Sequence, residues 1–214
     1  MSRMGSRPII DAGPSLTFFS LNKERLLFAA LGSLSVPETV VEEIRRKSSK
    51  DRNFAPASRV LDKLPPTLWE VLSDEVTPEL SSVVQRISSM PMADRMTDGR
   101  DLGELMVIAH AVVIAEGGTD TFVFIEDGGG AGIARRQSSL LERRRKAGEP
   151  VGALKLINTQ TVLKRAVIGG LIKDRAEMRK LYADMRLKDG ALVPIDDTDL
   201  LSRALWKRAP GSSQ

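Results

Sequence analysis

The sequence predicts an α/β protein with three layers, α/β/α, in which a central, mostly parallel sheet is flanked by helices. Short apolar segments of strand length alternate with longer segments whose apolar residues recur at helical spacing. Strands separated by helices run parallel and carry helices on both faces of the sheet. The 214 residues suffice for one domain with its own core, and 42% hydrophobic residues is ordinary for a globular protein.

The ends of the chain and its composition set the expected organisation. We expect one domain over residues 8–208, with flexible tails at residues 1–7 and 209–214. The first residues lack the apolar segment of a secretory signal, and the longest apolar stretch, 105–115, is too short to span a bilayer. The absence of cysteine excludes disulfides and suits a reducing compartment. These features predict a cytoplasmic protein with no membrane association.

The first half of the chain contains apolar segments of strand length and several helical patterns. Pro14 suits the first turn of a helix. Val40, Val41 and Ile44 share one helix face. In chain order we expect a strand at 8–10, a helix from 13, a strand at 34–36, a helix at 37–47, a mixed helix and loop at 51–66, a strand at 67–72, a helix at 77–89 and a loop at 89–100.

The second half contains the most apolar helix of the chain and a buried strand that ends in acidic residues. Leu105, Ile108 and Val112 recur at helical spacing. In chain order we expect a helix at 101–115, strands at 121–125 and 153–157 separated by a basic helix at 133–146, helices at 159–171 and 175–186, and a short helix at 197–205.

Two of the expected strands are followed directly by acids. Asp11 follows the first strand, and Glu126 and Asp127 follow the strand at 121–125. Sites in parallel sheets form at the carboxyl ends of the strands. If both strands are central, these carboxylates meet at one edge of the sheet.

Two of the expected helices add one acid each. Glu43 lies beside Ile44 and about 60° round the helix from Val40, so it borders the packed face. Glu104 lies in the first turn of the apolar helix. Each acid taken alone also fits a turn, a helix cap or a solvated charge.

Together these acids predict a site for a divalent cation. Crowded carboxylates repel one another unless a cation lies between them. Ligands that are all oxygen suit Mg²⁺ or Mn²⁺. Such ions serve phosphodiester cleavage by activating water and stabilising developing charge.

Four segments, in order, resemble the acidic motifs of the PIN-domain ribonucleases, the family that includes the VapC-like toxins of toxin–antitoxin pairs. They are Ile9-Ile10-Asp11-Ala12-Gly13-Pro14, Val36-Pro37-Glu38-Thr39-Val40-Val41-Glu42-Glu43-Ile44, Asp101-Leu102-Gly103-Glu104 with Val107-Ile108-Ala109-His110-Ala111, and Phe122-Val123-Phe124-Ile125-Glu126-Asp127. The helical segments at 162–173 and 175–187 are similar to the C-terminal part of the toxin-like members. The resemblance covers most of residues 8–201.

The resemblance implies a PIN-like fold and a metal-dependent endoribonuclease that cleaves RNA, acts as the toxin of a toxin–antitoxin pair, forms a homodimer and is held inactive by a cognate antitoxin. By position it implies catalytic metal ligands at Asp11, Glu43, Glu104 and Asp127. Glu126 is the alternative for the fourth position. A PIN-like module that binds RNA or protein without cleavage stays open as an alternative.

Several residues are candidates for contacts with RNA. Ser15 lies near the first acid and is expected to help position a ligand or water. The basic segment predicts either a phosphate-binding strip beside the acids or a solvated helix face, and its candidate residues are Arg135, Arg136, Arg143 and Arg144. A net charge of +4 favours a polyanionic partner weakly.

Two remaining features suggest other chemistries. The glycine-rich run at 128–132 predicts a flexible turn beside the site or, less consistently with the spacing of known motifs, the loop of a nucleotide-binding α/β protein. His110 is the single histidine, and it lies about 240° round the helix from Glu104. Ribonuclease chemistry that uses two histidines is therefore excluded.

Overall fold

The structure is a computed structural model that describes residues 6–126 and 128–208, and it is organised around a five-stranded sheet. All neighbouring strands pair in parallel, in the order β3-β2-β1-β4-β5. The strands are β1 (Ile9–Ile10), β2 (Leu34–Pro37), β3 (Trp69–Leu72), β4 (Thr121–Phe124) and β5 (Leu154–Ile157). The predicted α/β/α class is confirmed.

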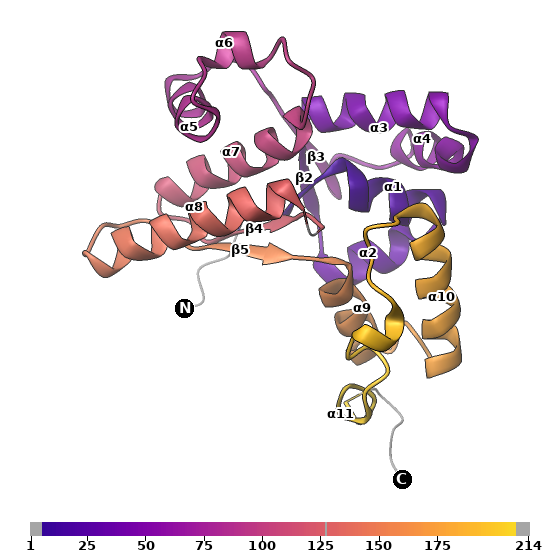
Figure 1. Cartoon of the computed structure of the whole chain (residues 1–214). Helices are drawn as coiled ribbons and strands as arrows, with labels where there is room; N and C mark the ends of the chain where they lie inside the picture. The colour runs from indigo at the N-terminus through magenta and orange to yellow at the C-terminus, as the bar shows by residue number, and fades with distance from the viewer. Residues whose placement is uncertain (1–5, 127, 209–214) are drawn as a thin grey trace.

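Helices cover both faces of this sheet, as Figure 1 shows. One side carries α1 (Ala12–Ser20), α2 (Glu24–Leu31), α3 (Glu38–Lys50), α4 (Ala55–Leu61), α9 (Thr159–Ile168) and α10 (Arg175–Lys188). The other side carries α5 (Pro78–Ser88), α6 (Met92–Arg95), α7 (Leu102–Glu116) and α8 (Gly129–Lys146). Short helices η1 (Arg52–Phe54), η2 (Ile195–Asp197) and α11 (Arg203–Trp206) complete the fold.

The core explains why α7 is apolar around almost its whole circumference. This helix packs against strands of the sheet on one side and against α5 and α8 on others. Met106 and Ile108 are both fully buried. A helix enclosed in this way needs no polar face, unlike the amphipathic α3.

The order of the strands determines where a site forms. The connection that leaves β1 leads to β2, whereas β4 lies on the other side of β1 and leads on to β5. The chain therefore diverges between β1 and β4, and a crevice forms at the carboxyl ends of these strands. The backbone N–H of Asp11 donates to the carbonyl of Phe124 (3.1 Å), which ties the ends of the two strands together.

Three expected segments differ from the structure. The predicted loop at 89–100 contains α6, whereas η1 and α4 confirm the mixed helix and loop expected at 51–66. The predicted turn at 128–132 is largely helical, because α8 begins at Gly129. The tail expected at 1–7 is ordered at its end, since the Ser6 N–H donates to the Asp120 carbonyl (3.2 Å) and Arg7 donates to the Pro66 carbonyl (3.3 Å).

The remaining expectations about the ends concern residues 1–5 and 209–214, which lie outside the described part of the chain. Within residues 6–126 and 128–208, no helix combines the length and apolar character that crossing a bilayer requires.

Candidate active site

An acidic pocket of about 400 Å³ lies at the carboxyl ends of β1 and β4. Its acidic residues are Asp11, Glu43, Asp101, Glu104, Glu126 and Asp189, and its basic residues are Lys47 and Lys188. Four of these, Asp11, Glu43, Glu104 and Glu126, are among the site residues expected from the sequence. Residues from both ends of the chain thus meet in one pocket.

Asp11 is the most deeply placed of these acids, with 8% of its surface exposed. Its Oδ1 atom is buried and has no hydrogen-bond partner among the described residues. The pKa of Asp11 is raised from 3.8 to about 6, chiefly by burial, with a further rise from the carboxylates of Glu43 and Glu104. Backbone N–H groups at the start of α1 oppose the rise. Asp11 therefore presents an unsatisfied acceptor that a proton or a cation stabilises.

Gly103 allows two of the acids to approach the same point. A Cβ atom added at this position would lie 2.7 Å from Glu43 Oε2 and 3.6 Å from Asp11 Oδ1. These two oxygens therefore face one spot beside the first turn of α7. Any side chain larger than hydrogen would occupy the space between them.

Gly130 likewise leaves space for the carboxylate of Glu104, because it has no side chain. A Cβ atom at Gly130 would lie 2.6 Å from Glu104 Oε2, so α8 approaches α7 closely at its first turn. Burial raises the pKa of Glu104, and its acidic neighbours Asp101 and Glu43 add to the rise. The Gly130 N–H, which hydrogen-bonds Glu104, opposes it. Gly130 thus serves the packing of an acid, and a carboxylate against the start of α8 argues against a phosphate-binding loop.

Glu43 lies on α3 as the helical spacing predicts, and it is paired with Lys47 one turn later. Lys47 Nζ lies 2.7 Å from Glu43 Oε1, so the other carboxylate oxygen, Oε2, faces Gly103. The side chain of Glu43 is 23% exposed, at the border of the pocket. The pairing uses one carboxylate oxygen of Glu43 and directs the other inward.

Glu126 lines the pocket but also has a structural task. Its Oε1 atom accepts from the backbone N–H of Thr159 (2.8 Å) and from the Thr159 hydroxyl. This contact ties the end of β4 to the start of α9. Asp127, the other candidate for the fourth position, lies outside the described residues.

The acids share a pocket without being arranged as ligands. Among the described residues, no group of three or more His, Asp or Glu side chains lies close enough to hold one metal ion as it stands. Glu43 is turned toward Lys47 and Glu104 toward Gly130. Coordination of a single ion by these groups requires rotation of the glutamate side chains.

Ser15 has a structural role. It is fully buried, and its hydroxyl donates to the carbonyl of Asp11 (2.7 Å) across the first turn of α1. The expected contact with RNA does not fit this burial. Ser15 instead stabilises the turn that presents Asp11.

The basic residues of α8 are divided between its two ends. Arg135 and Arg136 lie in the first half of the helix and are exposed. Arg143 and Arg144 lie about 20 Å along the helix from Gly130, at 1.5 Å per residue. Arg144 binds Glu116 (2.5 Å) and Glu149 (2.8 Å). The expected strip beside the acids therefore does not extend to Arg143 and Arg144.

The loop that precedes α7 brings an acid that is not among the ligands expected from the sequence. Asp101 lines the pocket and has a left-handed backbone conformation, φ 51°. A non-glycine residue in this region is strained, and such strain often occurs at functional sites. A local sequence pattern does not reveal this conformation.

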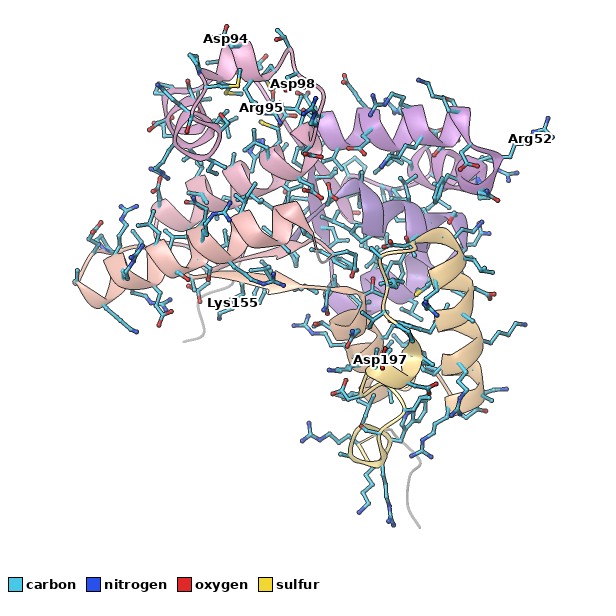
Figure 2. All side chains as sticks on the ribbon, in the orientation of Figure 1. Arg52, Asp94, Arg95, Asp98, Lys155 and Asp197 are labelled. Atoms are coloured by element: carbon cyan, nitrogen blue, oxygen red, sulfur yellow. The ribbon has the colours of Figure 1, made fainter. Side chains whose placement is uncertain are left out.

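A buried arginine supports the same loop. Arg95 is 8% exposed, and its guanidinium donates to the carbonyls of Asp98 and Arg100. Figure 2 labels Arg95 at the end of α6 and Asp98 on the connection that leads to α7. Because Gly99 lines the acidic pocket, Arg95 fixes the backbone at its rim.

His110 is engaged outside the acidic pocket, in a polar network at the end of β3. Its Nε2 lies 2.8 Å from Asp74 Oδ1, and Asp74 Oδ2 accepts from the Thr39 backbone N–H (2.7 Å) and the Thr39 hydroxyl. Burial acts to raise the pKa of Asp74, but the donors of His110 and Thr39 hold it below its usual value. The network joins α7, α3 and the segment after β3.

Asp74→Asn is expected to lower the free energy of unfolding at pH 7 by about 1–3 kcal/mol. The asparagine amide would place its own N–H donors against His110 or Thr39, where the carboxylate now accepts hydrogen bonds. A carboxyl whose folded pKa is depressed stabilises the fold above its unfolded pKa. This contribution is lost as pH falls through the folded pKa. Urea unfolding at pH 7 and pH 3 measures both effects, with exposed Glu75→Gln as the control. Equal stability of Asp74→Asn and wild type at pH 7 would contradict this account.

A larger hollow of about 710 Å³ lies elsewhere, between α2 and α4. Its lining combines Phe28, Val60 and Leu64 with exposed cations and one acid, Glu24. We assign the site to the smaller acidic pocket, because that pocket gathers the acids at the carboxyl ends of central strands.

The comparisons with known proteins give no match, whether to a family model, a curated protein or a solved structure.

Proposed function

We propose that the protein is a metal-dependent endoribonuclease of the PIN-domain type that uses Mg²⁺ or Mn²⁺. The observation that carries this proposal is that Asp11, Glu43 and Glu104, far apart in sequence, line one pocket at the carboxyl ends of the parallel strands. Their convergence supports a role that none of them could perform as a separate turn or cap residue.

Three observations support the fit of the pocket to a divalent cation. Asp11 Oδ1 is buried and has no hydrogen-bond partner among the described residues. Gly103 and Gly130 leave room for the carboxylates of α3 and α7. The donors are all oxygen, as Mg²⁺ and Mn²⁺ prefer.

Asp11, Glu43 and Glu104 are the residues that would hold the ion, with Glu126 or Asp127 in the fourth position. When bound, the ion supplies activation of water and stabilisation of the charge on the phosphodiester. The protein contributes the placement of its carboxylates, which the starts of α1 and α7 and the body of α3 provide. Burial of Asp11 also excludes water and strengthens its interaction with a cation.

Cleavage of a single-stranded RNA in the presence of Mn²⁺ tests the proposal. We expect cleavage with Mn²⁺ and loss of cleavage when EDTA is added, because the carboxylates alone cannot stabilise a phosphorane-like charge. Gel analysis of an end-labelled RNA measures it. Undiminished cleavage in EDTA would point to a contaminating ribonuclease or to chemistry without a metal.

As part of the same proposal, the protein is the cytoplasmic toxin of a toxin–antitoxin pair, works as a homodimer and is bound by a cognate antitoxin. Co-expression with the product of the neighbouring reading frame tests the antitoxin. We expect a stable complex in which cleavage is suppressed, and light scattering of the free protein gives its oligomeric state.

A second candidate is a PIN-like module that binds RNA or protein without cleavage. The pairing of Glu43 with Lys47 favours it, because it neutralises one acid without any metal ion. Tight binding of RNA without cleavage at any Mn²⁺ concentration would support this candidate over the enzyme.

A further inference from the structure

Lys47 is the basic residue that acts most directly on the acidic pocket. Its ammonium lies 2.7 Å from Glu43 Oε1. It also acts on Glu104, whose pKa it lowers against the larger effect of burial. One cation therefore interacts with two of the three acids that the proposed function assigns to a divalent ion.

The contact with Glu43 leaves the inner part of the pocket uncovered. Lys47 binds Oε1, while Oε2 of the same carboxylate faces Gly103 and Asp11. An ion held between Glu43 and Glu104 would share both anions with the ammonium. Two cations at such short separation repel each other strongly in a partly buried site.

The side chain of Lys47 can move away from Glu43 without disturbing the fold. Its side chain is 46% exposed, and its flexible four-carbon stem starts from the outer part of α3. Lys188, the other lysine of the pocket, differs because its Nζ donates to the Asn53 carbonyl (3.0 Å) and links α10 to η1.

We propose that Lys47 is the internal counter-ion of the acidic pocket, which a divalent cation displaces, and that the released ammonium then binds a phosphate of the RNA. This inference rests on the proposed function. The ammonium is a compact charge with three donors and no acceptor, which suits a phosphate oxygen at the mouth of the pocket.

The first test measures Mn²⁺ binding and thermal unfolding of wild type, Lys47→Met and the control Lys50→Met, an exposed lysine one turn further along α3. Without Mn²⁺, Lys47→Met is expected to melt at a lower temperature than wild type, because the carboxylates lose their counter-ion. With Mn²⁺ it is expected to bind the ion about tenfold more tightly, because the repulsion is gone. Lys50→Met is expected to match wild type in both, and Lys47→Gln serves as a second variant.

The second test measures binding of an RNA whose 2′-O-methyl sugars prevent cleavage. With saturating Mn²⁺, Lys47→Met is expected to bind this RNA about five- to tenfold more weakly, with a salt dependence smaller by about one phosphate contact. In EDTA the two proteins are expected to bind alike, because Lys47 is then held by Glu43.

The outcomes separate this inference from the proposed function. Mn²⁺ affinity that is unchanged or weaker in Lys47→Met overturns the counter-ion role, and unchanged RNA affinity with Mn²⁺ overturns the phosphate contact. A wild-type protein that binds no Mn²⁺ overturns the proposed function itself, and the inference falls with it.

Discussion

Asp11→Asn is expected to reduce Mn²⁺-dependent RNA cleavage by at least about 100-fold while making the metal-free protein more stable. The loss of activity follows from the removal of a charged oxygen ligand deep in the pocket. The gain in stability follows from burial, because an asparagine at this position carries no charge that must be desolvated. Asp11→Asn is thus expected to lower the activity and to raise the stability of the metal-free protein.

The pH dependence shows the sign of the stability effect. The folded pKa of Asp11 is raised from 3.8 to about 6, so the folded state holds an extra proton between these values. The stabilisation that protonated Asp11 contributes is fully present below the unfolded pKa of 3.8, and it is lost as the pH rises through the folded pKa of about 6. Wild type therefore loses on the order of 1–3 kcal/mol over this range that Asp11→Asn keeps.

Urea unfolding in EDTA at pH 4 and pH 7.5 measures this difference, and an RNA cleavage assay measures the activity. Asp94→Asn is the matched control, because Asp94 is exposed on α6 and is not among the residues that line the acidic pocket (Figure 2). Mn²⁺ should stabilise wild type and the control more than Asp11→Asn at pH 7.5. Wild-type cleavage by Asp11→Asn, or a loss of stability at pH 7.5, would refute the role assigned to this carboxylate.

Gly152→Ala is expected to destabilise the protein by about 3 kcal/mol or more. A Cβ atom at Gly152 would lie 2.3 Å from both the carbonyl carbon and the oxygen of Thr119, and 2.8 Å from the Asp120 nitrogen. These are backbone atoms, which cannot rotate away as a side chain can. The segments that lead into β4 and β5 would have to separate, and the hydrogen bond from the Gly152 N–H to the Ala115 carbonyl (2.7 Å) would be strained.

Thermal and urea unfolding of the purified variant measure this effect. Gly190→Ala is the control, because a Cβ atom there meets no atom within 4 Å. We expect the control to differ from wild type by less than about 0.5 kcal/mol. If Gly152→Ala is as stable as wild type, the segments before β4 and β5 can move apart at little cost, and the close backbone packing at Gly152 does not limit stability.

Much of the fold follows from local patterns in the sequence. Apolar segments of strand length predict β1, β2, β4 and β5, and helical spacing predicts α3 and α7, because these patterns reflect burial on one face or all round an element. Segments with mixed patterns do not predict their secondary structure, and α6 within the expected loop at 89–100 is an example. A helix of one turn buries too few residues to leave a recognisable period.

The position of three acids in the pocket also follows from local reasoning. Asp11 directly follows a strand, Glu43 borders the packed face of a helix and Glu104 occupies a first helical turn. Parallel pairing and alternating helices bring such positions to one edge of a sheet. Each of these placements depends on the type and direction of one element.

What the chain alone could specify, then, is which residues belong to strands, helices and their ends, because those choices depend on neighbours a few positions away. The partners of each side chain depend on residues that are distant in sequence. Glu126 binds Thr159, Ser15 is enclosed beneath Asp11, and Arg144 lies at the far end of α8 with Glu116. Packing of whole elements sets these contacts, and it also places Lys47 among the acids of the pocket.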